Sequence, residues 1–213
     1  MLKEFYADYM RWRADQKENS RPCTIIVRGE GDDFREEEVR CDQIRVGDVV
    51  KLGDGDIAPA DLLILTTRDG KGEAFNKTTS LDGETNLKPK LALRQVNGSF
   101  FGIKRARLSA HCHQPIADLY RFNARVEYGN DSLDADLKQF MHRGASLQNS
   151  EKICGLVVHT STDCKLIMNQ GKYGFKQSKL YKGINALMVF NIVLILCIAA
   201  VFAALNYSFV TDN

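Results

Sequence analysis

The segment Leu187–Leu205 is apolar along its whole length and constrains the fold more than any other part of the chain. It reads LMVFNIVLILCIAAVFAAL, and Asn191 is its one clearly polar side chain. About 20 apolar residues in a helix cross the hydrocarbon core of a bilayer. A buried core helix is the alternative, but such a helix seldom lacks charge over so long a run. The sequence therefore predicts a membrane-spanning helix over residues 184–207.

Charged residues flank this segment unequally. Only Asp212 follows it, whereas four lysines lie just before it: Lys172, Lys176, Lys179 and Lys182. Because lysine and arginine are enriched in short cytoplasmic segments, the N-terminal side of the span is predicted to be cytoplasmic. Residues 166–183 then form a basic, helical connector, and residues 208–213 begin an exoplasmic loop. The start of the chain carries charges throughout, which excludes a signal peptide.

The part of the chain before the connector changes periodicity near Pro22. Residues 1–20 have a helical pattern of apolar side chains, at Leu2, Phe5, Tyr6, Tyr9 and Trp12. After Pro22 come short β-branched runs separated by turn residues, predicted as strands at Cys23–Val27, Val46–Leu52, Leu62–Thr67 and Ile153–Val158. A short helix is predicted within residues 133–142, and residues 97–128 are less regular. The prediction is a mainly β fold, a small distorted β-sandwich or barrel.

Composition narrows the classes of function. Basic and acidic residues number 29 and 27, so net charge gives no indication of nucleic-acid binding. The six cysteines form no C-x-x-C pair and are predicted to be scattered and reduced rather than a disulfide framework. His111-Cys112-His113 lacks metal-ligand spacing, and no metal site is predicted there.

Several known signatures are missing from the sequence. It contains no G-x-x-x-x-G-K-[ST] loop for nucleotide phosphates and no nucleophile elbow. The acidic stretch from Asp54 to Asp61 is not an EF-hand, because Pro59 and Leu65 replace the required glycine and last glutamate.

The stretch Ser80–Lys88 reads SLDGETNLK. Its Asp-Gly pair alone would be an ordinary surface turn. The longer string, however, resembles the D-G-E-T-N-L-K signature of the phospholipid flippases, a branch of the P-type ATPases. The related loop elsewhere in that superfamily reads T-G-E, so Asp82 favours the lipid-transporting branch over an ion pump.

The resemblance covers nearly the whole chain. Further matching blocks are Val46–Lys51 (VGDVVK), Pro59–Leu65 (PADLLIL), Arg143–Ser150 (RGASLQNS), Gly155–Val158 and Lys165–Asn169. Lys77, Gln148 and Ser150 depart from the residues usual in that family. The resemblance implies that residues 21–165 are a cytoplasmic actuator domain with a jelly-roll-like sandwich fold. It also implies that residues 1–20 are a stalk helix following a second transmembrane helix, and that the span is the third.

The resemblance also implies roles for four residues. Glu84 would orient and deprotonate the water that hydrolyses an aspartyl phosphate, when the actuator domain rotates. Gly83 would let the backbone approach the phosphate, and Asp82 and Thr85 would shape the loop. The full-length relatives use ATP and Mg²⁺, move phospholipids to the cytoplasmic leaflet, and in many cases have an accessory subunit. The D-K-T-G-T string of their phosphorylation site does not occur here, so this chain contains no residues for ATP or Mg²⁺.

Two interpretations follow from that difference. The chain is expected to be a fragment of a longer flippase, in which the intact D-G-E-T loop is needed for hydrolysis. The alternative is a short membrane-anchored module with a regulatory or binding role, which would have no physical need for Glu84.

Overall fold

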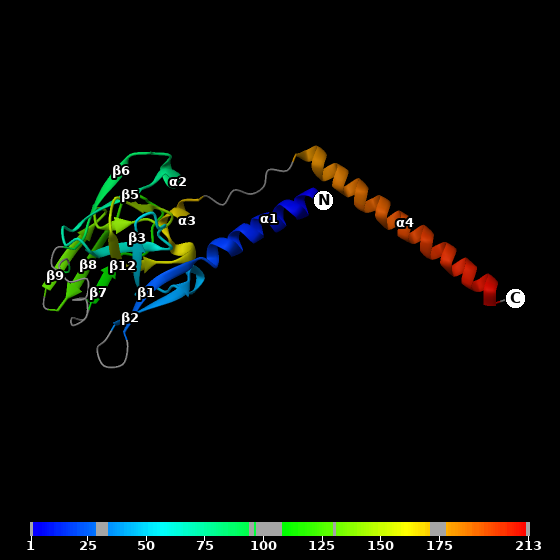
Figure 1. Cartoon of the computed structure of the whole chain (residues 1–213). Helices are drawn as coiled ribbons and strands as arrows, with labels where there is room; N and C mark the ends of the chain where they lie inside the picture. The colour runs from blue at the N-terminus through cyan, green and yellow to red at the C-terminus, as the bar shows by residue number, and fades with distance from the viewer. Residues whose placement is uncertain are drawn as a thin grey trace. The chain divides into compact units, whose positions relative to one another are not determined.

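The computed structural model describes residues 2–28, 34–93, 96, 108–129, 131–170 and 178–211. The chain divides into two units, Met1–Gly171 and Lys172–Asn213. Among the described residues, the first unit contains helices α1 to α3 and the strands, and the second contains the long helix α4 (Figure 1).

The first unit opens with helix α1, Leu2–Asn19, as the apolar spacing predicted. The helix ends just before Pro22, whose ring cannot continue a helix. Its aromatic side chains are exposed within this unit; Phe5 and Trp12 retain 75% and 58% of their surface. The role of α1 as a stalk stays a prediction.

The central layer is a six-stranded antiparallel sheet in the order β10-β4-β12-β3-β1-β2. Its strands are β1 Pro22–Arg28, β2 Phe34–Arg40, β3 Val49–Gly53, β4 Asp61–Thr67, β10 Phe140–Met141 and β12 Lys152–His159. The four predicted strands are all present. The strand expected from Val46 begins only at Val49, because Asp48 accepts a hydrogen bond from the Arg45 amide and closes a turn there.

Two three-stranded antiparallel sheets complete the unit. One consists of β5 Glu73–Lys77, β6 Leu87–Leu91 and β11 Ser146–Gln148, and the other of β7 Leu108–Cys112, β8 Asn123–Tyr128 and β9 Asp131–Asp136. Short helices are α2 Thr79–Asp82, α3 Lys165–Asn169, and the 3-10 turns η1 Cys41–Gln43 and η3 Ser161–Asp163. The mainly β sandwich class is therefore confirmed.

Strand β4 explains how the layers pack, because all seven of its residues are buried. Leu62 and Ile64 join a core cluster that includes residues of β5 and β11. Leu63 and Leu65, on the opposite face, join a second cluster that includes residues of β8 and β9. Since successive side chains of a strand point to opposite faces, the central sheet has an apolar core on each side.

The helix predicted within residues 133–142 is wrong. The region forms β9, a turn at residues 137–139 and then β10. In β9, Leu133 and Ala135 pair with Val126 and Ala124 of β8 and contribute to the second core cluster. The apolar residues that suggested helical spacing thus come from a strand, a turn and a second strand. Of the irregular region at residues 97–128, the part up to residue 107 lies outside the described residues.

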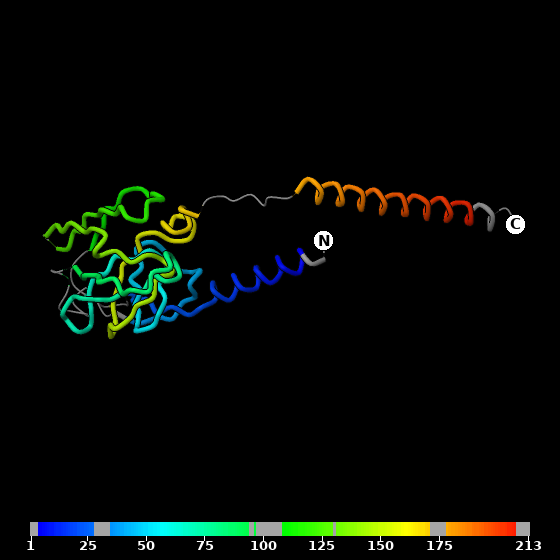
Figure 2. The backbone as a smooth tube through the Cα atoms, turned by 90° about the horizontal axis from the view of Figure 1, so that it is seen from above, coloured from blue at the N-terminus to red at the C-terminus, as the bar shows by residue number. Residues whose placement is uncertain are grey.

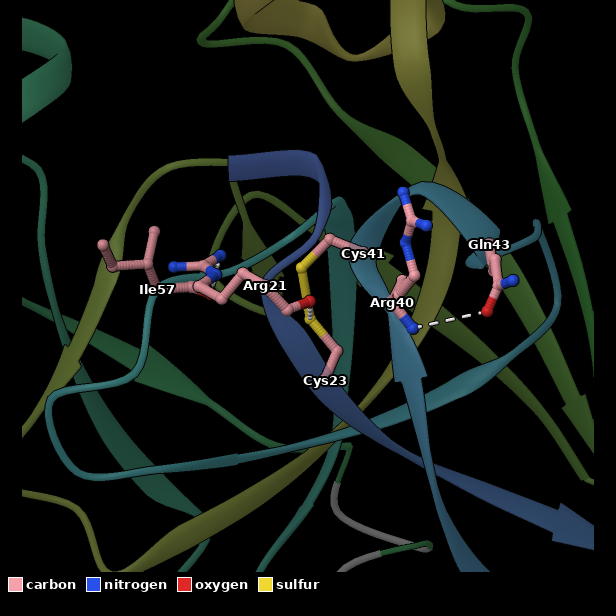
Figure 3. Close-up of a disulfide and its surroundings, with 6 residues drawn as sticks. All are labelled: Arg21, Cys23, Arg40, Cys41, Gln43 and Ile57. Carbon is pink, nitrogen blue, oxygen red and sulfur yellow. Dashed lines mark hydrogen bonds between the residues drawn. A yellow bond between two sulfur atoms is a disulfide. The ribbon is translucent and has the colours of Figure 1, made fainter. Parts of the chain in front are cut away.

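The prediction of six reduced cysteines is also wrong, because Cys23 and Cys41 form a disulfide with a Cα–Cα distance of 5.8 Å. Figure 3 shows the bond between β1 and the start of η1. The β1–β2 register places Cys23 opposite Val39, and Cys41 follows just beyond the end of β2. That register is not visible in cysteine spacing. Cys112, Cys154, Cys164 and Cys197 are free.

The disulfide is expected to stabilise the first unit. It closes a loop with a sequence separation of 18, and the entropy lost by the unfolded chain corresponds to about 3 kcal/mol. Replacing Cys41 by serine should lower the free energy of unfolding in urea by that amount, and adding a reductant should then have no further effect. Cys112→Ser, at a free cysteine, is the control. Equal unfolding curves for Cys41→Ser and the unaltered chain would contradict this expectation.

The second unit is helix α4, Lys179–Thr211, and Figure 2 shows its coloured part as one unbroken helix. Its Lys179–Tyr207 part has the length and composition to cross a membrane, and an 18-residue window within it has a mean hydropathy of 2.8 and is not buried. The Asn191 amide nitrogen donates to the Leu187 carbonyl at 3.1 Å, which gives this polar side chain a partner within the helix.

The bounds of α4 differ from the predicted ones. The helix begins before residue 184, so the last part of the predicted connector belongs to it. It also continues through residues 208–211, where a loop was predicted; no glycine or proline interrupts it there. The middle of the predicted connector, residues 171–177, lies outside the described residues, as does the turn expected at residues 29–33.

Candidate functional site

The candidate site is the loop between β5 and β6, in which a single helical turn, α2, leads directly into Gly83. Gly83 has φ +75° and donates its amide hydrogen to the Thr79 carbonyl at 3.1 Å, which ends the turn in the left-handed conformation. Glycine adopts this conformation without steric cost, whereas a side chain would be strained there. The Asp-Gly order therefore determines where the loop reverses direction.

The Asp82 carboxylate stabilises the loop by accepting hydrogen bonds. It accepts hydrogen bonds from the Thr78 hydroxyl at 2.9 Å, from the Glu84 amide at 3.0 Å and from the Lys88 ammonium at 2.6 Å. These donors stabilise the ionised form and lower the pKa of Asp82 to about 2, with the Lys88 hydrogen bond as the largest cause. Asp82 thus remains charged, and its carboxylate holds the Glu84 amide just after Gly83 and the Thr78 hydroxyl just before α2.

Glu84 and Thr85 lie at the exposed part of the same loop. The Glu84 side chain retains 57% of its surface, and its Oε2 lies 2.9 Å from the Lys88 Nζ. The Glu84 carbonyl accepts a hydrogen bond from the Thr79 hydroxyl at 2.9 Å. The backbone of Glu84 is therefore fixed, while its carboxylate is open to a group arriving from outside the loop.

Lys88, at the start of β6, belongs to the site although it was not among the predicted site residues. Its ammonium bridges the carboxylates of Asp82 and Glu84, and these hydrogen bonds raise its pKa. The signal for it was present in the sequence, because Lys88 is the last residue of the SLDGETNLK string. Its charge offsets the two negative charges that the loop brings together.

Removing the Lys88 charge should raise the pKa of Asp82. The folded-state pKa, now about 2, lies below the ordinary value of 3.8, so the ion pair adds stability that is lost as pH falls through the folded pKa. In Lys88→Met, we expect the pKa of Asp82 to return toward 3.8, measured by NMR titration of the carboxyl carbon. Lys71→Met, at an exposed lysine outside the loop, is the matched control. An unchanged Asp82 titration in Lys88→Met would show that the bridge does not form in solution.

The region that the structure describes contains no group of three or more His, Cys, Asp and Glu side chains placed to hold a metal ion. His111 lies in β7 and His113 just after it, and the His111 Nε2 is 3.9 Å from a carboxylate oxygen of Glu127.

Sequence comparisons relate the chain to known transporters. It is 32% identical over 97% of its length to phospholipid-transporting ATPase IG of Homo sapiens. It is 29% identical over 98% of its length to phospholipid-transporting ATPase IC of Mus musculus. The chain spans 18% and 16% of the length of these relatives. Along nearly its whole length, the chain is similar to a segment of these phospholipid-transporting ATPases.

Other comparisons are less specific. A protein of Toxoplasma gondii named guanylate cyclase is 30% identical over 92% of this chain, which spans 4% of it. No protein-family model matches the sequence. A solved zinc-transporting PIB-type ATPase in the E2.Pi state aligns with 80% of the chain at a TM-score of 0.41 and 12% identity, too weak a likeness to establish a shared fold.

Proposed function

We propose that the chain is the actuator part of an ATP-driven phospholipid flippase, and that Glu84 acts in hydrolysis of its aspartyl phosphate. The observation that carries the proposal is the exposed carboxylate of Glu84. Its backbone is held in place by Asp82 and Gly83. The similarity to phospholipid-transporting ATPases over 97% of the chain supports it.

Water is a weak nucleophile at neutral pH, so a positioned carboxylate can orient it and accept its proton. Such general-base help contributes roughly 10²–10⁴-fold in rate. Gly83 has no Cβ, and a Cβ built there would meet no atom within 4 Å, so the exposed turn leaves room for an acyl phosphate to approach. Asp82 holds the turn, Thr85 extends it, and Lys88 keeps the Glu84 carboxylate paired until a reaction partner arrives.

ATP and Mg²⁺ belong to other parts of such a protein. The described part of this chain holds no cluster of metal-binding side chains, and its sequence has no phosphate-binding loop. When bound elsewhere, ATP would supply the phosphoryl group, and Mg²⁺ would neutralise charge on its phosphate oxygens. The substrate would be a membrane phospholipid, carried to the cytoplasmic leaflet, and an accessory subunit would be a partner of the complete protein. The lysines that precede the apolar segment of α4 favour a cytoplasmic position for the first unit.

A second candidate is a membrane-anchored regulatory or binding module. One observation favours it: a related segment occurs in a protein named guanylate cyclase, which is not named as a transporter. The Cys23–Cys41 disulfide also needs an explanation in a cytoplasmic domain, because reducing compartments disfavour such bonds. In this candidate, the loop around Glu84 would have no hydrolytic role.

Labelling with radioactive ATP separates the two candidates. Membranes would be incubated with ATP labelled at the γ-phosphate and precipitated with an antibody against residues 80–88. The flippase proposal expects a band several-fold larger than 24.0 kDa whose label is removed by hydroxylamine, as an acyl phosphate requires. An unlabelled band near 24.0 kDa would instead support the binding module.

A further inference from the structure

Asp61, the first residue of β4, is fully buried, and its carboxylate joins two distant segments. Its Oδ1 accepts a hydrogen bond from the Arg143 amide at 2.9 Å. Its Oδ2 accepts one from the Lys165 amide, the first residue of α3, at 2.8 Å. A buried carboxylate requires such donors. The segments of Arg143 and Lys165 are therefore hydrogen-bonded to the same side chain.

The Arg143–Gly144 turn in turn supports the candidate site. The Ser80 hydroxyl of α2 donates to the Gly144 carbonyl at 3.0 Å. Gly144 has φ +84°, and a Cβ built on it would lie 3.2 Å from Leu81 Cδ2 and 3.9 Å from Leu166 Cδ2. Gly144 therefore lies between a side chain of α2 and a side chain of α3, and its positive φ would strain any larger residue there.

The start of α3 is held by its side chain as well. The Lys165 ammonium donates to the carbonyls of Ile116, Asp118 and Arg121 at 3.3, 3.0 and 2.8 Å. Lys165 is 1% exposed, and burial lowers its pKa. Along the sequence, α3 is the last element of the first unit before the segment that leads to α4. Asp61 thus contacts both the Arg143–Gly144 turn, which supports the Glu84 loop, and the start of α3, the last element of the first unit.

We propose that Asp61 is a positioning residue that ties the Glu84 loop to α3, so that the two segments move as one body. The path runs from Asp61 to the Arg143–Gly144 turn, and from that turn to Ser80 and Leu81 of α2. Its second branch is the bond from Asp61 to the Lys165 amide. The link between the Glu84 loop and α3 does not depend on the proposed function. Its effect on hydrolysis rests on the proposed function of Glu84.

The test is hydrogen exchange of the whole chain in detergent micelles, read by mass spectrometry. Asp61→Asn replaces one carboxylate oxygen by an amide donor, so one backbone N–H loses its acceptor. Losing a buried hydrogen bond of this kind corresponds to about 10- to 100-fold faster exchange. We expect this acceleration in both residues 79–84 and residues 165–169, with β8 and β9 unchanged. Asp136→Asn is the matched control, because Asp136 also accepts a backbone amide, that of Lys138, but joins no distant segments.

Two results would overturn the proposal. One is faster exchange in residues 165–169 of Asp61→Asn with unchanged exchange in residues 79–84. The other is a uniform acceleration over the whole first unit, which would make Asp61 a general stability residue. Leu81→Ala provides a second test that leaves the buried carboxylate intact. It removes the side chain that faces Gly144, and it should accelerate exchange of residues 165–169; no change there would refute the link even if Asp61→Asn does not fold.

A second readout separates this proposal from the proposed function. In the complete protein, Asp61→Asn should slow decay of the phosphorylated form while leaving its formation unchanged. If exchange of the two segments is coupled but phosphoenzyme decay is unaffected, the link exists and the hydrolytic role of the loop is wrong. If decay slows without coupled exchange, the flippase proposal stands and Asp61 does not act through α3.

Discussion

Replacing Glu84 by glutamine in the complete protein is expected to slow decay of the phosphorylated form by roughly 10²–10⁴-fold. Glutamine keeps the shape of the side chain and an oxygen that can accept from Lys88, whose ammonium lies 2.9 Å from Glu84 Oε2. Its amide cannot accept a proton from water. Formation of the phosphorylated form does not need this carboxylate, so the form should accumulate.

A chase experiment measures this directly. Membranes labelled with radioactive ATP would be diluted into unlabelled ATP, and the decay of acid-stable label would be followed for both forms. Glu151→Gln, at an exposed glutamate outside the loop, is the matched control and should decay at the normal rate. Normal turnover in Glu84→Gln would rule out the hydrolytic role of this loop.

Replacing Leu196 by arginine should disturb membrane insertion of α4. Leu196 lies near the middle of the apolar segment, and it is surrounded by side chains suited to hydrocarbon. An arginine at the centre of a spanning helix costs about 3 kcal/mol on insertion scales, which corresponds to roughly a hundredfold shift toward the uninserted form. Leu180→Arg is the matched control, because it lies beside Lys179 and Lys182 at the lysine-rich end.

Alkaline extraction of membranes measures the effect. The unaltered chain and Leu180→Arg should stay with the membrane pellet, and a larger share of Leu196→Arg should be released. Equal retention of all three chains would contradict a single-span arrangement and would favour another mode of attachment.

The parts of the fold that were predicted correctly are those with a strong local pattern. The charge-free run of α4 and the β-branched run of β4 needed only neighbouring residues to be recognised. Strand β9 was misjudged because its apolar residues reach the core by pairing with β8, a partner that local periodicity does not reveal. The Cys23–Cys41 bond depends in the same way on the β1–β2 register.

The residues of the candidate site also differ in whether a local sequence pattern reveals them. Asp82, Gly83, Glu84 and Thr85 are consecutive, so a sequence motif could place all four in one loop. Lys88 was missed because its bridge to two carboxylates requires β6 to fold back beside α2. The sequence places Asp61 in a rejected calcium-like stretch and in a matching block, but it does not reveal its partners Arg143 and Lys165, which are 82 and 104 residues away.

The most direct measurement is phospholipid movement by the complete protein reconstituted into vesicles. A fluorescent phospholipid would be placed in both leaflets, and its protection from a membrane-impermeant quencher would be followed with and without ATP. We predict ATP-dependent movement toward the leaflet on the side of the first unit, and none with Glu84→Gln. The proposed function would be contradicted if the unaltered protein moved no phospholipid with ATP, or if Glu84→Gln moved it at the same rate.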